Sequence, residues 1–177
     1  PVLLVILMRS SWWQYQPTGM KNNGYLVQPP VNLPLTTQES FDRKWLLVYA
    51  LNKSCAKKCI EDVTMLRQIH RASGRNDDQL AIVLLSQKEI EPQLRSELQA
   101  IYPSFNLVID TSGESFPTLQ GINQAMRASD SNLQDARTFI LDPMLNVILV
   151  YAVDANPNDI HKDLKRLLKW SDQESRK

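Results

Sequence analysis

The sequence predicts an α/β fold with a mixed central sheet, helices on both faces, and a C-terminal β-hairpin followed by a helix. Three observations predict it. Short apolar runs typical of buried strands alternate with segments whose apolar residues recur every three or four positions. These segments follow one another in the order β-α-β-α-β-α-β-β-α. The last two strand segments are close enough in sequence to form a hairpin, which makes the sheet mixed.

The first predicted strand and helix form the most informative stretch of the chain. Trp45 to Leu51 is an apolar run of seven residues bounded by polar residues, the pattern of a strand buried on both faces. From Ile60 to Ile69 the apolar residues recur every three positions, which predicts a helix. Gly74 is the expected end of that helix, followed by a polar loop at 75–79.

Two further strand and helix pairs follow. Residues 80–85 predict a second buried strand, and Pro92 suits the first position of a helix, although Ser86 with Glu89 offers an earlier capping box. Residues 105–109 predict a third strand, and 116–128 a helix.

The C-terminal part predicts two strands, 138–141 and 147–153, joined across Asp142 and Pro143. Asn158 or Asp159 is expected to cap a last helix, because apolar residues at helical spacing begin at Ile160. We therefore assign the domain to 39–170 and a polar tail to 171–177.

The N-terminal flank has a different character. Its first eight residues are apolar, too few to span a bilayer, and Trp12, Trp13 and Tyr15 follow. We interpret 1–15 as the end of a truncated membrane anchor that holds the domain on the periplasmic side of a bacterial inner membrane. A buried first strand or a hydrophobic leader is the alternative. The proline-containing segment 16–38 predicts an extended linker, with a short edge strand at 24–27 as an alternative.

Composition excludes several functions. The chain has 177 residues, 43% hydrophobic and 22% charged, which indicates a globular protein. Its net charge of +1, without a basic stripe, argues against nucleic-acid binding. It has five glycines and no glycine-rich phosphate loop, which argues against nucleotide chemistry. Because there are only two cysteines, the pair is expected to be functional rather than a scaffold of disulfides.

The cysteines, Cys55 and Cys59, stand where the first core strand gives way to its helix. If both are helical, their Cα atoms lie roughly 6 Å apart, within disulfide range. The positive end of the helix dipole favours thiolate over thiol, as do Lys53, Lys57 and Lys58. Thiolates serve redox exchange and also ligation of Cu(I) or Zn(II), and the spacing alone does not choose between them. Core filling or a structural bridge is a further alternative.

Three stretches resemble one known family. They are the strand W-L-L-V-Y that leads into Cys55-x-x-x-Cys59, the L-R-Q at 66–68, and the F-I-L-D-P at 139–143. Together they resemble the SCO group of cytochrome c oxidase assembly proteins, within the thioredoxin-like superfamily, over residues 25–170. The resemblance implies a thioredoxin-like fold. It also implies that two cysteines and a distant histidine hold copper for delivery to the oxidase, and that the cysteines exchange disulfides.

The chain departs from that pattern at the histidine. The matching position is Gln134, preceded by Leu133, so the copper histidine of the group is missing. His70 lies eleven residues beyond Cys59, about 16 Å along the helix, and cannot reach. His161, in the last helix, is a weak alternative ligand. Two thiolates without an imidazole suit Cu(I) but hold Cu(II) poorly. Classical thioredoxins also carry a proline where Arg137 precedes Thr138 here.

The leading hypothesis is a membrane-tethered, SCO-like dithiol protein that acts in thiol–disulfide exchange during cytochrome c oxidase biogenesis. Its partners would be protein thiols or oxidase subunits, with Cys55 as nucleophile and Cys59 as the resolving cysteine. One alternative is a Cu(I) metallochaperone that uses the same two cysteines. A second is a redox-silent interaction domain with a structural disulfide.

Overall fold

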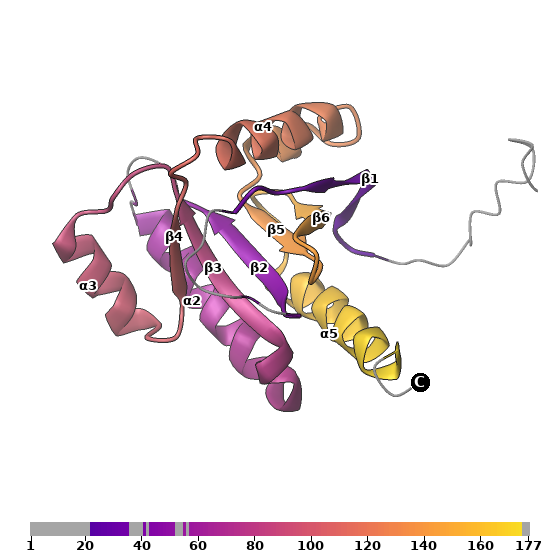
Figure 1. Cartoon of the computed structure of the whole chain (residues 1–177), viewed down its shortest axis with the longest axis horizontal. Helices are drawn as coiled ribbons and strands as arrows, with labels where there is room; N and C mark the ends of the chain where they lie inside the picture. Colours follow the sequence, from indigo (N-terminus) through magenta and orange to yellow (C-terminus); the bar gives the residue numbers. More distant parts are fainter. Residues whose placement is uncertain (1–21, 36–40, 42, 52–54, 56, 175–177) are drawn as a thin grey trace, which may run out of the picture.

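The computed structural model describes residues 22–35, 41, 43–51, 55 and 57–174, which form a mixed sheet with helices on both faces (Figure 1). In this part of the chain the sheet has six strands in the order β1-β6-β5-β2-β3-β4. The strands are β1 (Tyr25–Asn32), β2 (Trp45–Ala50), β3 (Leu80–Ser86), β4 (Asn106–Ile109), β5 (Thr138–Leu141) and β6 (Asn146–Tyr151). The predicted fold class is thereby confirmed.

The helices of the described residues are α2 (Lys57–Ala72), α3 (Pro92–Ile101), α4 (Ser115–Met126) and α5 (Pro157–Glu174), with short 3₁₀ helices η1 (Gly74–Gln79) and η2 (Ser131–Asp135). Pro92 is the first residue of α3, as predicted, and the earlier capping box is not used. The segment predicted as a polar loop after Gly74 is η1. Helix α5 runs to Glu174, past the predicted start of the polar tail.

The topology explains which helices share a face. Strands β2, β3 and β4 are parallel neighbours, and right-handed crossovers between them carry α2 and α3 to the same face. Helix α5 packs beside α2 there, in a core that contains Leu66, Leu98 and Leu164. The opposite face is covered by α4 and η2, through residues such as Leu119 and Leu133. Strands β5, β6 and β1 complete the sheet as antiparallel neighbours.

Strand β2 lies at the centre of the sheet and is buried on both faces. Leu47 and Tyr49 belong to the core under α2, whereas Leu46 and Val48 belong to the core under α4. Each of these side chains is at most 1% exposed. A strand between two layers of helices needs apolar residues at successive positions, which is why the run in the sequence is continuous rather than alternating.

Strand β1 corrects the prediction of an extended linker over residues 25–32. This segment pairs with β6 at the edge of the sheet, so the alternative of an edge strand is right and the strand is longer than expected. A buried carboxylate of α5 fixes its start. Asp163, 1% exposed, accepts hydrogen bonds from the backbone N–H groups of Asn23 and Gly24, both at 2.9 Å.

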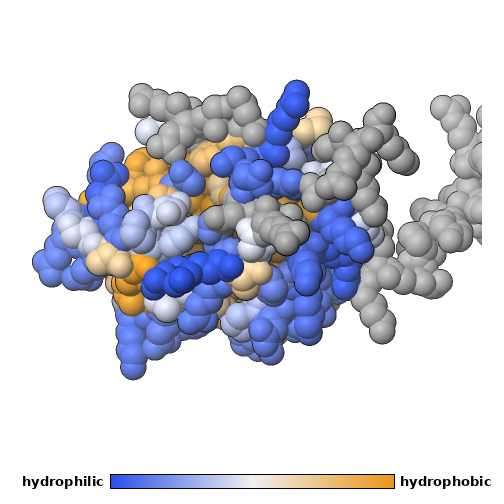
Figure 2. Space-filling view, turned by 90° about the horizontal axis from the view of Figure 1, so that it is seen from below, coloured by the Kyte–Doolittle hydropathy of each residue, from blue (hydrophilic) through white to orange (hydrophobic). Residues whose placement is uncertain are grey.

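The predicted membrane anchor at 1–15 lies outside the described residues. Among the helices that the structure describes, none is long and apolar enough to cross a membrane. Seen from below, where α2, α3 and α5 lie, the surface is mostly hydrophilic, with apolar residues visible only in parts of it (Figure 2).

Candidate dithiol site

The two cysteines lie at the edge of the sheet where the parallel strands end. The backbone N–H of Leu51 donates to the carbonyl of Leu85 at 2.8 Å, so the pairing of β2 with β3 continues one residue beyond β2. Cys55 follows four residues later, and Cys59 lies in the first turn of α2. The carboxyl ends of parallel strands are where open α/β sheets usually carry their sites.

Cys55 and Cys59 are joined by a disulfide, with their Cα atoms 5.1 Å apart. The prediction that they are close enough to bridge is correct. The expectation that both lie in the helix is not, because α2 begins at Lys57 and Cys55 precedes it. Because Cys55 precedes the helix, its side chain need not point in the direction that the helix sets for Cys59. The two cysteines can therefore have different surroundings.

The two cysteines differ in exposure. Cys59 is 3% exposed and belongs to the core cluster that includes Tyr49, Leu51 and Val63. Cys55 is partly exposed and only borders that cluster. An incoming thiolate must reach a sulfur atom along the axis of the bond that it breaks, so access decides which sulfur reacts first. Cys55 is the accessible one.

Electrostatics around the disulfide are more balanced than the lysines in the sequence indicate. Lys57 lies 3.9 Å from Glu61, and Lys58 lies 2.6 Å from Asp62. Lys53 lies outside the described residues. Lys57 and Lys58 therefore each have a carboxylate one helical turn later. The amino end of α2, with its unpaired N–H groups, remains the main feature that favours a thiolate here.

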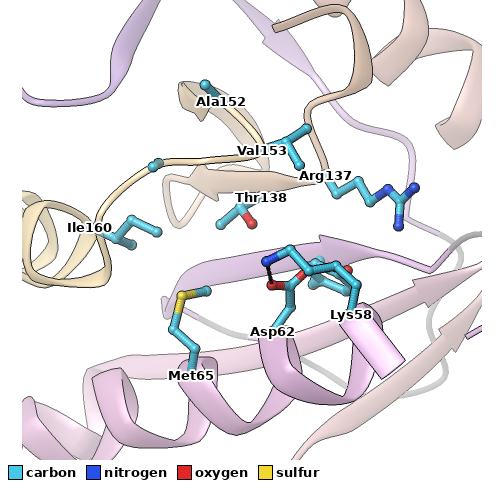
Figure 3. Close-up of a pocket in the computed structure, with 10 residues that line it drawn as sticks. Lys58, Asp62, Met65, Arg137, Thr138, Ala152, Val153 and Ile160 are labelled. Atoms are coloured by element: carbon cyan, nitrogen blue, oxygen red, sulfur yellow. Dashed lines mark hydrogen bonds and ion pairs between the residues drawn. The ribbon is translucent and has the colours of Figure 1, made fainter. Parts of the chain in front are cut away.

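Asp62 also connects the helix to the sheet. It accepts a hydrogen bond of 2.8 Å from the hydroxyl of Tyr49, and Figure 3 shows its ion pair with Lys58 in a small pocket that faces Thr138. Burial raises the pKa of Tyr49, and the bond to Asp62 raises it further, while Arg137 acts in the opposite direction. Tyr49 is therefore a neutral hydrogen-bond donor beside the dithiol.

A groove of about 680 Å³ runs from Cys55 along the loop after β3 to the first turns of α3. We call it the Cys55 groove. It is lined by Leu51, Cys55, the last residue of β3 (Ser86), the loop residues 87–91 and the helix residues Gln93, Leu94 and Glu97. A second hollow of about 330 Å³ shares Leu51 and Gln87 with it and extends toward α4 and η2. The partly exposed cysteine thus lies beside a surface depression large enough for a ligand.

The residues considered as copper ligands lie apart from one another. Gln134 is exposed in η2 and lines the second hollow together with Leu51. His70 packs edge-on against Tyr102 at 5.6 Å between ring centroids. His161 Nε2 lies 3.2 Å from the carbonyl oxygen of Ala72.

Ala72 lies thirteen residues beyond Cys59 in α2, which is roughly 20 Å along the helix at 1.5 Å per residue. The contact with Ala72 therefore holds His161 far from the disulfide. Within the described part of the chain, no three His, Cys, Asp or Glu side chains are grouped so that they could hold a metal ion. Among the described His, Cys, Asp and Glu residues, the donors available to a soft metal are therefore the two sulfurs, and only after the disulfide is reduced.

Sequence reasoning missed two features of the surroundings of the dithiol. They are the loop 87–91 after β3, which lines the Cys55 groove, and Asp62 of α2, which is the partner of Tyr49. Asp62 has a local signal, since it follows Lys58 at the spacing of a helical ion pair. The loop has none, because its approach to Cys55 depends on the pairing of β2 with β3.

Residues 45–171 match the family model described as "Transmembrane-like, thioredoxin-like, C-terminal domain". The chain belongs to this family. The part of the chain that matches this thioredoxin-like family runs from β2 into the last turns of α5 and does not include β1. No curated protein matches the chain.

Solved structures show the same fold. Apo Sco1 from Thermus thermophilus is similar with a TM-score of 0.57 at 14% identity, over 84% of this chain and 99% of that one. Copper-bound ScoI of Arabidopsis thaliana has a TM-score of 0.52 at 11% identity, over 73% and 87%. A putative protein disulfide isomerase from Bacteroides thetaiotaomicron has a TM-score of 0.52 at 13% identity, over 82% and 89%. The predicted resemblance of this thioredoxin-like chain to the SCO group is thus confirmed at the level of the fold.

Proposed function

We propose that this thioredoxin-like chain is a thiol–disulfide exchange protein whose reactive pair is Cys55 and Cys59. The observation that carries the proposal is the asymmetry of the bridge. Cys55 is partly exposed at the end of a groove, whereas Cys59 is buried in the core. A purely structural bridge gains nothing from this arrangement. An exchange reaction needs one accessible sulfur for the partner and one protected sulfur that closes the ring.

A partner dithiol reduces the Cys55–Cys59 disulfide in two steps. A partner thiolate attacks the sulfur of Cys55, which breaks the bridge and releases Cys59 as a thiolate that takes up a proton. A second partner thiolate then attacks the partner sulfur of the mixed disulfide and releases Cys55 as a thiolate. The chain gains two electrons and the partner becomes a disulfide; in the opposite direction Cys55 attacks and Cys59 resolves.

Single-cysteine variants test this assignment. In Cys59→Ser the remaining thiol of Cys55 should react with an aromatic disulfide reagent at least about tenfold faster than the thiol of Cys59 in Cys55→Ser, because access limits the rate. Circular dichroism of both variants checks that the fold is retained. Equal rates for the two folded variants would contradict the roles given to the cysteines.

The redox potential of the pair tests exchange itself. Equilibration with glutathione buffers, followed by alkylation of free thiols, should place the potential within the range of about −120 to −270 mV found for exchange proteins. A value below about −300 mV, together with no transfer to a protein substrate, would instead indicate a structural bridge and an interaction domain.

Binding of Cu(I) is a second candidate function, favoured by the adjacency of the two sulfurs. Copper-bound structures exist among the proteins with this fold. Reduced Cys55 and Cys59 would supply two soft thiolates, which suit Cu(I), and no described His, Asp or Glu completes a three-ligand set. Anaerobic titration of the reduced chain should then give a one-to-one complex that is lost in Cys59→Ser. Retained binding in that variant would count against a dithiolate clamp.

We further propose that the reaction takes place on the periplasmic side of a bacterial inner membrane, during assembly of cytochrome c oxidase. Support comes from the apolar start of the sequence and from the resemblance to the SCO group. Cell fractionation of the full-length protein and assay of oxidase activity in a deletion strain test the location and the role separately. Recovery of the protein in the soluble fraction would remove the anchor from the proposal.

A further inference from the structure

The Cys55 groove has an apolar base and an acidic rim. Leu51, at its base, is 4% exposed, and Ile90 and Leu94 are partly buried against the core under α2. Its charged lining residues are all exposed. They are Lys88 and the three carboxylates Glu89, Glu91 and Glu97. The groove therefore carries a net charge of −2, although the whole chain carries +1.

The described part of the chain provides no ion pair to the three carboxylates of the groove. Glu97 accepts a hydrogen bond of 3.3 Å from the side-chain amide of Gln93, and among the described residues no cation pairs with Glu89, Glu91 or Glu97. The first turns of α2 are different, because each lysine there has its own carboxylate. The negative potential of the groove is thus available to a molecule that approaches Cys55.

From these contacts we infer that the groove recognises a cationic segment of a partner protein, in which a reactive cysteine has an apolar neighbour and flanking lysine or arginine residues. This inference rests on the proposed function. The partner thiolate attacks Cys55 and displaces Cys59, as described above. The apolar neighbour covers Leu51, Ile90 and Leu94, and the basic residues meet the glutamates.

The same charges select against the commonest small thiol. Glutathione is an anion, so the three carboxylates repel it as it approaches Cys55, whereas a cationic segment is drawn in. The groove also extends from Cys55 to the second turn of α3, a length that suits a stretch of peptide better than a single compact molecule.

The test uses the oxidised full chain and two synthetic peptides, Lys-Leu-Cys-Lys and Glu-Leu-Cys-Glu, both blocked at their ends. The rate of disulfide reduction is followed by acid quench and alkylation. The cationic peptide should react at least about tenfold faster at low salt, and the difference should shrink at 0.5 M salt because ions screen the attraction.

A triple variant, Glu89→Gln with Glu91→Gln and Glu97→Gln, removes the charges without changing the shape of the side chains. It should slow the cationic peptide by about tenfold. The matched control is Asp78→Asn with Glu114→Gln and Asp154→Asn, which changes the net charge equally at exposed positions that do not line the groove. It should change the rate less than twofold. Lys88→Glu should accelerate the cationic peptide further.

Dithiothreitol, a neutral thiol, separates the two proposals. If it reduces all variants equally while the triple variant still prefers the cationic peptide, the groove is not the recognition site and exchange at Cys55 stands. If neither dithiothreitol nor either peptide reduces the wild-type bridge, both the exchange function and the groove inference fail.

Discussion

The hydroxyl of Tyr49 donates a hydrogen bond of 2.8 Å to the carboxylate of Asp62. This bond joins the end of β2 to the second turn of α2, on either side of the segment that carries the disulfide. Tyr49 is 1% exposed and the Asp62 side chain 14% exposed, so the bond is partly shielded from water. It therefore helps to hold α2, and with it Cys59, at a fixed position against the sheet.

Tyr49→Phe should lower the free energy of unfolding by about 2 kcal/mol, because a partly buried hydrogen bond from a buried hydroxyl to a charged group is lost. The pKa of Tyr49 is raised in the folded chain, so its contribution is present below pH 10.0 and is lost as the pH rises further. Urea unfolding at pH 7 and at pH 11 measures both effects. Equal losses at the two pH values would show that Tyr49 does not titrate as described.

Tyr25→Phe is the matched control, since Tyr25 also donates to a carboxylate, that of Asp130, at 2.8 Å. Tyr25 is partly exposed, whereas Tyr49 is 1% exposed, so the loss should be smaller, about 1 kcal/mol. Reduction of the Cys55–Cys59 disulfide should become faster in Tyr49→Phe alone. The same acceleration in both variants would point to general destabilisation rather than to the position of α2.

Asp110→Asn should destabilise the chain at neutral pH. Burial alone raises the pKa of the Asp110 carboxyl, but hydrogen bonds from the N–H of Phe116 at 3.1 Å, the hydroxyl of Ser112 and the N–H of Gly113, both at 3.0 Å, outweigh it. The pKa is therefore lowered in the folded chain.

A lowered pKa stabilises the folded state above the ordinary value of 3.8, and this contribution is lost as the pH falls through the folded-state pKa. We expect a difference of about 1–2 kcal/mol between wild type and Asp110→Asn at pH 7, shrinking at pH 3 and below. Chemical unfolding across this pH range measures it. A difference that stays constant with pH would contradict the assignment.

Asp163→Asn should release the start of β1. The carboxylate of Asp163 accepts four hydrogen bonds of 2.9 to 3.0 Å, from the backbone and side chain of Asn23, the backbone of Gly24 and the hydroxyl of Tyr151. An amide cannot accept all of them, so we expect a loss of about 2–4 kcal/mol and faster hydrogen exchange in β1.

Asp159→Asn on the same helix is its control, because Asp159 makes a more exposed ion pair with Lys162 at 3.2 Å. Surface pairs of this kind contribute about 0–1 kcal/mol. Unchanged exchange of the β1 amides in Asp163→Asn would show that other contacts hold the strand.

Gly24→Ala should destabilise the chain through a clash. A Cβ atom at Gly24 would lie 2.7 Å from ring carbons of Tyr151, whose side chain is 2% exposed and closely packed. We expect a loss of about 1–3 kcal/mol in urea unfolding. Gly121→Ala is the control, since a Cβ there meets nothing within 4 Å and alanine favours the helix by about 0.5–1 kcal/mol. The free energy of unfolding should therefore fall in Gly24→Ala and rise in Gly121→Ala.

Local patterns in the sequence were sufficient for the central elements. The apolar run from Trp45 and the spacing from Ile60 each reflect a residue's immediate neighbours along one strand or one helix, and β2 and α2 are where they predict. Strand β1 was harder to recognise, because Pro29 and Pro30 resemble a linker and its partner β6 is more than a hundred residues away. The buried carboxylate of Asp163 has no local signal at all.

The sequence by itself determined the fold class, the junction of strand and helix that carries the dithiol, and the closeness of Cys55 and Cys59, because two residues only four apart at the start of a helix cannot lie far from one another. Only the tertiary structure decided that Cys59 is buried and Cys55 partly exposed, and that Glu89, Glu91 and Glu97 line the same groove as Cys55. Exposure and charge around a sulfur depend on which strands pair and which helices pack against them, and those contacts join residues far apart in the chain.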